Sequence, residues 1–157
     1  MVKLKSKIKH QISYLSWKIQ NPKKPFHHFY IYKIQGEIRK SQRHPTLGKK
    51  IKDYERFIKT SEIEKDFLIK QGLRPNHLFV DYGCGSMRLG KSLIPYLDKN
   101  NYIGLDITDK FFMLGTSPID KNYLASKRPI LKTITNTSLR EIKALDVSYL
   151  MSCAVLY

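Results

Sequence analysis

The stretch from Leu78 to Gly90 (LFVDYGCGSMRLG) passes from an apolar strand through a glycine-rich turn into a helix. Gly83 and Gly85 can adopt positive φ, so the backbone there can approach a ligand closely. A helix that starts near Ser86 would direct free amide groups and the positive end of its dipole toward the same position. The stretch therefore predicts a nucleotide-binding corner at the end of a strand.

A second apolar strand, Tyr102 to Asp106, follows and ends in a carboxylate. A carboxylate about 20 residues after such a turn binds ribose hydroxyls in dinucleotide-binding folds. The two strands with the helix between them predict a βαβ unit. The turn has Arg88 where the dinucleotide fingerprint has its third glycine, and the sequence contains no G-x-x-x-x-G-K-[ST] loop. A nicotinamide-dependent dehydrogenase is therefore disfavoured.

The pattern D-x-G-C-G-S-x-R-x-G, followed by an acidic strand end, resembles the class I S-adenosylmethionine-dependent methyltransferases. Similar pieces are HPTLG at 44–48, QGLRP at 71–75 and NYIGLDI at 101–107. The resemblance covers residues 44–157 and is strong over 78–107. It implies an α/β, Rossmann-like fold, S-adenosyl-L-methionine as the cofactor, and methyl transfer by in-line displacement at the sulfonium methyl group.

The resemblance also implies which residues contact the cofactor: Asp81, Gly83, Cys84, Gly85, Arg88, Asp106 and Ile107. Asp81 would lie beside the methionine amino group, although it could instead cap the following turn. Asp106 would bind the ribose, and it could also cap the helix from Ile107 onward. Arg88 would meet the methionine carboxylate or form a salt bridge that points away from it.

No other motif predicts a reactive centre. Cys84 is interpreted as a small residue between glycines, because the sequence indicates no histidine near it. The histidines do not have the spacing of metal ligands, so we predict no metal site. No general base is assigned, and Asn136 stands where the family often has an acidic residue, near the predicted adenine position.

Composition limits the architecture. A chain of 157 residues with 41% apolar content is long enough for one domain with a hydrophobic core. No apolar stretch reaches the length of a membrane span, and two cysteines make no disulfide framework. We predict a cytoplasmic protein, with peripheral membrane association as an alternative. Oligomeric state is not predicted.

Positive charge is concentrated at the N-terminus. Residues 1–50 hold 13 of the 29 Lys and Arg and one acid, or +12 of the formal +16. An apolar stripe with helical spacing runs through this part: Leu4, Ile8, Ile12, Leu15 and Ile19. The stripe could lie on an anionic membrane or beside nucleic acid, or it could pack on the domain while the lysines stay in solvent. We therefore divide the chain into a basic helical extension (1–50) and a partial S-adenosylmethionine-binding domain (51–157).

Weaker patterns predict the remaining elements. Ser61-x-x-Glu64 predicts a helix start, with Ile63, Phe67 and Leu68 facing inward and Gly72 closing the helix. In the helix after the glycine turn, Leu89, Leu93, Tyr96 and Leu97 should face the sheet. The other expected elements are helices within 109–126 and 138–145 and strands over 130–135 and 147–157.

The strand at 147–157 resembles the fourth motif of a family whose sheet has seven strands. We therefore expect an incomplete parallel sheet of about four strands, an apolar edge at the last of them, and little methyl transfer by a chain truncated there. We predict that the chain is the cofactor-binding half of an S-adenosylmethionine-dependent methyltransferase. A small-molecule, lipid or glycan acceptor is favoured over RNA. The alternative is a catalytically inactive protein that binds RNA or anionic membrane through its basic N-terminus.

Overall fold

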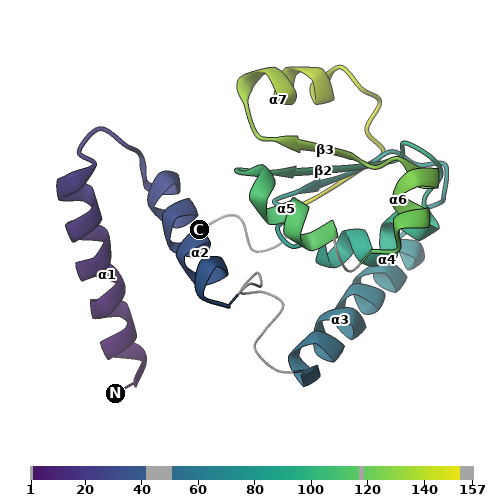
Figure 1. Ribbon diagram of the computed structural model, residues 1–157. Coiled ribbons are helices and arrows are strands. Elements are labelled where there is room, and N and C mark those ends of the chain that lie inside the picture. The colour runs from purple at the N-terminus through teal and green to yellow at the C-terminus, as the bar shows by residue number, and fades with distance from the viewer. Residues whose placement is uncertain (1, 42–50, 117–118, 153–157) are drawn as a thin grey trace.

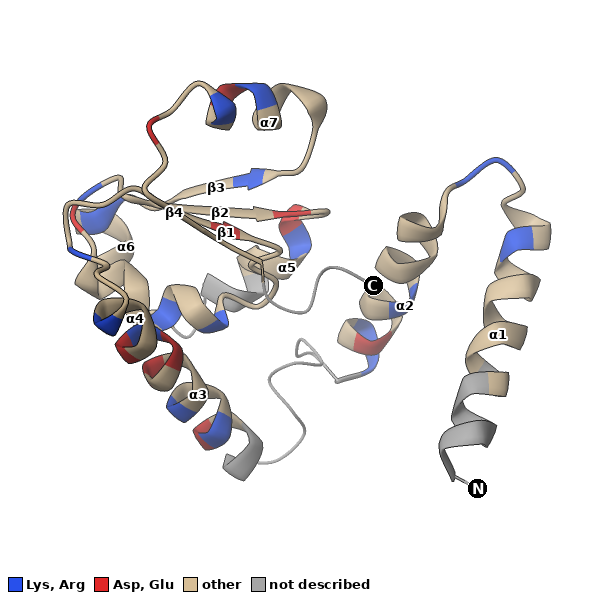
Figure 2. Cartoon of the chain, turned by 180° about the vertical axis from the view of Figure 1, so that it is seen from behind, with Lys and Arg blue, Asp and Glu red and all other residues tan. Residues whose placement is uncertain are grey.

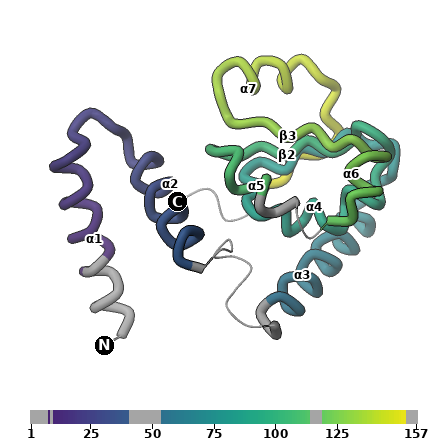
Figure 3. The backbone as a smooth tube through the Cα atoms, viewed as in Figure 1, coloured from purple at the N-terminus to yellow at the C-terminus, as the bar shows by residue number. Residues whose placement is uncertain are grey.

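The computed structural model describes residues 2–41, 51–116 and 119–152, so the predicted HPTLG segment at 44–48 lies outside the described residues. After the first three helices, the strands are separated by one or two helices each (Figures 1 and 3). The elements are α1 (Val2–Gln20), α2 (Phe26–Ser41), α3 (Ile51–Lys70), β1 (Phe79–Tyr82), α4 (Arg88–Tyr96), β2 (Tyr102–Asp106), α5 (Asp109–Thr116), α6 (Lys121–Lys127), β3 (Ile130–Thr133), α7 (Asn136–Lys143) and β4 (Tyr149–Met151).

Over the described residues, the sheet has four parallel strands in the order β3-β2-β1-β4. The predicted α/β class with about four parallel strands is confirmed. Strands β1, β2 and β3 succeed one another in one direction, whereas β4 lies on the other side of β1. The strand order therefore reverses between β1 and β4, and in open α/β sheets ligands bind outside the carboxyl ends of the strands at such a point.

Alternating side chains along the strands build two cores. Phe79 and Tyr102 are buried on one face of the sheet, together with Leu93 of α4. Val80 and Ile103 point to the other face and belong to a smaller core with α7. Figure 1 shows α4, α5 and α6 on one side of the sheet and α7 on the other.

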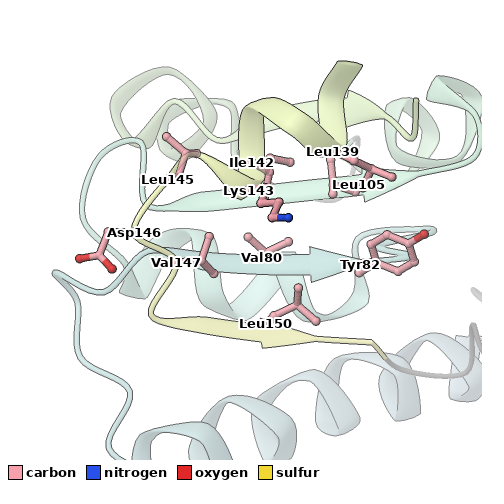
Figure 4. A pocket seen from close by; sticks show the side chains of 10 residues that line it. All are labelled: Val80, Tyr82, Leu105, Leu139, Ile142, Lys143, Leu145, Asp146, Val147 and Leu150. Carbon is pink, nitrogen blue, oxygen red and sulfur yellow. The ribbon is translucent and has the colours of Figure 1, made fainter. Parts of the chain in front are cut away.

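The face under α7 is partly open. A groove of about 480 Å³ runs between the sheet and α7 (Figure 4). Its apolar wall comes from Val80 of β1, Ile142 of α7 and Leu150 of β4. Among the described strands β4 is an edge, because it pairs with β1 and with no other described strand. The rest of the predicted strand, residues 153–157, lies outside the described residues.

Helix α4 approaches the sheet closely because of a glycine. A Cβ atom at Gly90 would lie 2.8 Å from the Tyr102 hydroxyl and 2.7 Å from Cε of Met87. Of the four predicted inward residues, Leu89, Leu93 and Leu97 are buried, and Tyr96 is partly buried against the same core.

Helix α3 differs from the prediction. It begins at Ile51, so Ser61 is not at the helix start; it is fully buried and donates a hydrogen bond to the Arg88 carbonyl. The prediction that Ile63 and Phe67 face inward is wrong, since they are 59% and 58% exposed, whereas Leu68 is buried as predicted. The side of α3 that carries Ser61 packs against α4. The side that carries Ile63 and Phe67 therefore faces solvent.

The C-terminal end of α3 follows the prediction. Gly72 has φ of 94°, and the Leu73 N–H donates to the Leu68 carbonyl. This is the hydrogen bond of a helix end closed by a left-handed glycine. The closed end directs the chain toward β1.

Helices α1 and α2 form an antiparallel hairpin set beside the sheet (Figures 1 and 3). The aromatic rings of Tyr14 and Trp17 pack on Phe29, which is completely buried. The described residues of the apolar stripe of α1, Ile8, Ile12, Leu15 and Ile19, point elsewhere and are exposed, so the interpretation that they pack on the domain is wrong. Hydropathy shows no helix among the described residues that is long and apolar enough to cross a membrane.

Candidate functional site

The carboxyl ends of β1 and β2 bring Asp81 and Asp106 to one edge of the sheet. Both are buried acids, and Figure 2 shows the acidic segments at these strand ends. Asp81 pairs in register with Gly104, so β2 continues two residues beyond that level to Asp106. The two carboxylates therefore lie on either side of the turn that follows β1, next to the point where the strand order reverses.

The turn has the predicted backbone conformation. Gly83 and Gly85 have φ of 83° and 51°. The helix predicted to start near Ser86 begins at Arg88. In the turn before it, the N–H groups of Gly83 and Cys84 donate to the Leu105 carbonyl at 2.7 and 3.0 Å. The Gly85 N–H donates to Oδ2 of Asp106 at 2.7 Å. The turn is thus held against β2 by its own hydrogen bonds, and the amides of Gly83, Cys84 and Gly85 are already used within the protein.

Asp106 links the turn to the segment after β2. Its Oδ2 accepts from the Gly85 N–H and its Oδ1 accepts from the Ile107 N–H at 2.7 Å. Burial raises the pKa of Asp106, and these two hydrogen bonds oppose the rise. Each carboxylate oxygen has two lone pairs, so each can accept one further hydrogen bond. A backbone-capping role and ribose binding are therefore compatible.

Asp81 is the more strongly perturbed carboxylate. Burial raises the pKa of Asp81 to about 6, the negative charges of Glu64 and Asp106 add to the rise, and a hydrogen bond from Tyr102 opposes it. The Tyr102 hydroxyl donates to Oδ2 of Asp81 at 2.6 Å, and burial holds the pKa of Tyr102 well above its usual value of 10. Sequence reasoning placed Tyr102 in a strand but missed this contact, because the two residues are 21 positions apart.

Arg88 takes the salt-bridge alternative in this structure. Its Nη2 lies 2.6 Å from Oε1 of Glu64, and its Nε donates to Oε2 of Glu64 at 3.2 Å. This is a two-point guanidinium–carboxylate pair, which fixes orientation as well as charge. The pair joins α3 to the start of α4. A contact between Arg88 and a cofactor carboxylate stays a prediction.

The Cys84 side chain belongs to the core. Its thiol is buried with Met87 and Tyr102, and burial raises the pKa of the Cys84 thiol far above its usual range. A thiol in that state is not a nucleophile at neutral pH. Among the described residues, no group of three or more His, Cys, Asp or Glu is arranged to hold a metal ion.

Tyr30 of α2 reaches the same edge of the sheet. Its ring meets Phe111 of α5 edge to face, with a centroid distance of 6.3 Å. Burial raises the pKa of Tyr30, and the charge of Asp106 adds to the rise. The aromatic run at 26–34 is visible in the sequence, but nothing local in it indicates which ring would lie near Asp106.

No protein-family model and no curated protein matches the chain. Among solved structures, the chain is similar to magnesium protoporphyrin IX methyltransferase (ChlM) from Synechocystis PCC 6803 with bound SAH, at 18% sequence identity and a TM-score of 0.47. The match covers 68% of this chain and 48% of that one, so the chain spans less than half the length of that protein. The four parallel strands and the helices that connect them define the α/β class of this chain.

Proposed function

We propose that this chain is the S-adenosyl-L-methionine-binding half of a methyltransferase that acts on a small-molecule, lipid or glycan acceptor. One observation carries the proposal. Two buried carboxylates, Asp81 and Asp106, stand at neighbouring strand ends on either side of a turn with left-handed glycines. This arrangement lies beside the reversal of strand order, where α/β sheets bind ligands.

The charge of this edge supports a cationic ligand. Glu64 and Asp106 both raise the pKa of Asp81, and Arg88 lowers it by a smaller amount than either of them. A net negative field attracts the ammonium and sulfonium groups of S-adenosylmethionine and repels a pyrophosphate. The turn amides that would otherwise bind a pyrophosphate are used inside the protein. Both features argue against a dinucleotide.

Four of the predicted residues then have a defined role. Asp81 holds the ammonium group, Asp106 accepts from the ribose hydroxyls, and Gly83 and Gly85 keep the space beside them free of side chains. When bound, S-adenosylmethionine supplies an electrophilic methyl group. The chain contributes by orientation, and a general base is needed only where the pKa of the acceptor requires one. Tyr30, next to Phe111, borders the same edge and would line the approach of the acceptor.

Calorimetry tests the binding step. The wild-type chain should bind S-adenosylhomocysteine and should not bind NAD. Asp106→Ala should weaken binding by about 1–3 kcal/mol, because charge-assisted hydrogen bonds to the ribose are lost. Asp109→Ala is the matched control, since Asp109 is an exposed acid three residues further on. Equal affinity of wild type and Asp106→Ala would remove Asp106 from the site.

A separate assay measures methyl transfer. Tritiated methyl groups from S-adenosylmethionine are followed into small-molecule, glycan, lipid and RNA acceptors. Label in one of the first three classes supports the acceptor proposal, and label in RNA alone contradicts it. Cofactor binding without label in any class would favour the alternative of a binding protein on a methyltransferase scaffold.

A further inference from the structure

Helix α1 has two different faces. One face carries Tyr14 and Trp17, whose rings pack on Phe29 of α2. The other carries an aliphatic stripe in open solvent: Ile8, Ile12, Leu15 and Ile19 are 46%, 62%, 60% and 81% exposed. The α1–α2 contact thus uses the aromatic face, and no described residue covers the aliphatic stripe.

The same helix is strongly cationic. The first 36 residues contain eight lysines and no acidic residue, and five of these lysines are in α1. In Figure 2 the described part of the α1–α2 hairpin shows basic positions, and its acidic position is in α2. An aliphatic stripe on a helix with this charge is the pattern of helices that lie in a membrane interface, with the stripe among acyl chains and the lysines at anionic headgroups.

We propose that α1 binds the surface of an anionic membrane through its aliphatic stripe, Ile8, Ile12, Leu15 and Ile19. The occupant follows from chemistry. A nucleic acid would pair with the lysines and leave the stripe in water, because the exposed rings that could stack on bases, Phe26 and Tyr32, belong to α2, and Trp17 of α1 is buried in the hairpin. A second copy of α1 would bring two lysine-rich helices together and be repelled. An anionic lipid surface would bury the stripe among its acyl chains and pair its headgroups with the lysines.

The inference does not depend on the proposed function, because none of the stripe residues lies near the carboxyl edge of the sheet. In this proposal, helix α1 alone attaches the α/β domain to the lipid surface. Membrane binding can therefore be retained or lost without any change in cofactor affinity, which keeps the two proposals separable.

Vesicle sedimentation of the full chain tests this inference. Wild type should pellet with phosphatidylcholine vesicles that contain phosphatidylserine, and binding should weaken at high salt and on pure phosphatidylcholine. The double variant Ile12→Gln/Leu15→Gln should bind roughly a hundredfold more weakly, since each buried aliphatic side chain is worth about a factor of ten. Glutamine is a good helix former, so the helix content measured by circular dichroism should not change.

The matched control is Ile63→Gln/Phe67→Gln on α3, which removes two apolar side chains of comparable exposure away from α1. This variant should pellet as wild type does. Three results would overturn the proposal: no pelleting of wild type with anionic vesicles, equal losses in the two double variants, or a dimer or RNA complex that is lost in Ile12→Gln/Leu15→Gln while vesicle binding is kept.

Discussion

Cofactor binding should depend on pH through Asp81. Its pKa of about 6 in the free protein is caused mainly by burial, and a ligand ammonium group interacts favourably with its ionised form. At about pH 5 roughly one tenth of the molecules carry an ionised Asp81, and at about pH 7 roughly nine tenths do. Affinity for S-adenosylhomocysteine should therefore rise about tenfold across this interval and level off above it.

Calorimetry at several pH values measures this dependence, because the ammonium and carboxylate groups of the ligand keep their charges across the interval. Asp81→Asn should bind weakly at every pH and show no such rise. Asp98→Asn, a change at an exposed acid, should follow wild type. A flat wild-type profile, or the same slope in Asp81→Asn, would refute the role given to Asp81.

The raised pKa of Asp81 also makes the free energy of unfolding depend on pH. The pKa of Asp81 is raised in the folded state from 3.8 to about 6. The contribution of Asp81 to the stability of the fold is therefore fully present below pH 3.8 and is lost as pH rises through 6. The loss amounts to about 3 kcal/mol, since each pKa unit corresponds to about 1.4 kcal/mol. Asp81→Asn should therefore be more stable than wild type in denaturant titrations above about pH 7, and the gain should vanish near about pH 4.

Two further predictions concern packing and the ion pair. Gly90→Ala should lower the free energy of unfolding by about 1–3 kcal/mol, because its methyl group would meet the Tyr102 hydroxyl, whereas Gly36→Ala, with no atom within 4 Å, should raise it by about 0.5–1 kcal/mol. Thermal denaturation of both variants decides this, and equal effects would contradict the close approach of α4. Arg88→Gln should cost about 1 kcal/mol of stability through loss of the pair with Glu64. Calorimetry with S-adenosylhomocysteine tests the predicted contact between Arg88 and the cofactor carboxylate: a tenfold loss of affinity in Arg88→Gln would support it, and unchanged affinity would limit Arg88 to the pair with Glu64.

Local signals identified much of this fold before any tertiary contact was known. Strand β2 begins and ends at the predicted residues, Tyr102 and Asp106. The left-handed conformations of Gly72, Gly83 and Gly85 were expected from their places after a helix and in a turn. These features depend on side-chain periodicity and on backbone sterics within a few residues, so a short stretch of sequence contains the information that determines them.

Contacts between distant segments decided the rest. The partner of Arg88 is Glu64, 24 residues away, and the partner of Asp81 is Tyr102, 21 residues away. Ser61 matched a helix-start motif, yet packing against α4 buried it in the middle of α3. The stripe of α1 predicted a helix, but only the aromatic contact with α2 determined that the stripe is exposed. Periodicity shows which side chains share a face, whereas the surface that a face meets depends on how elements far apart in the chain pack in space.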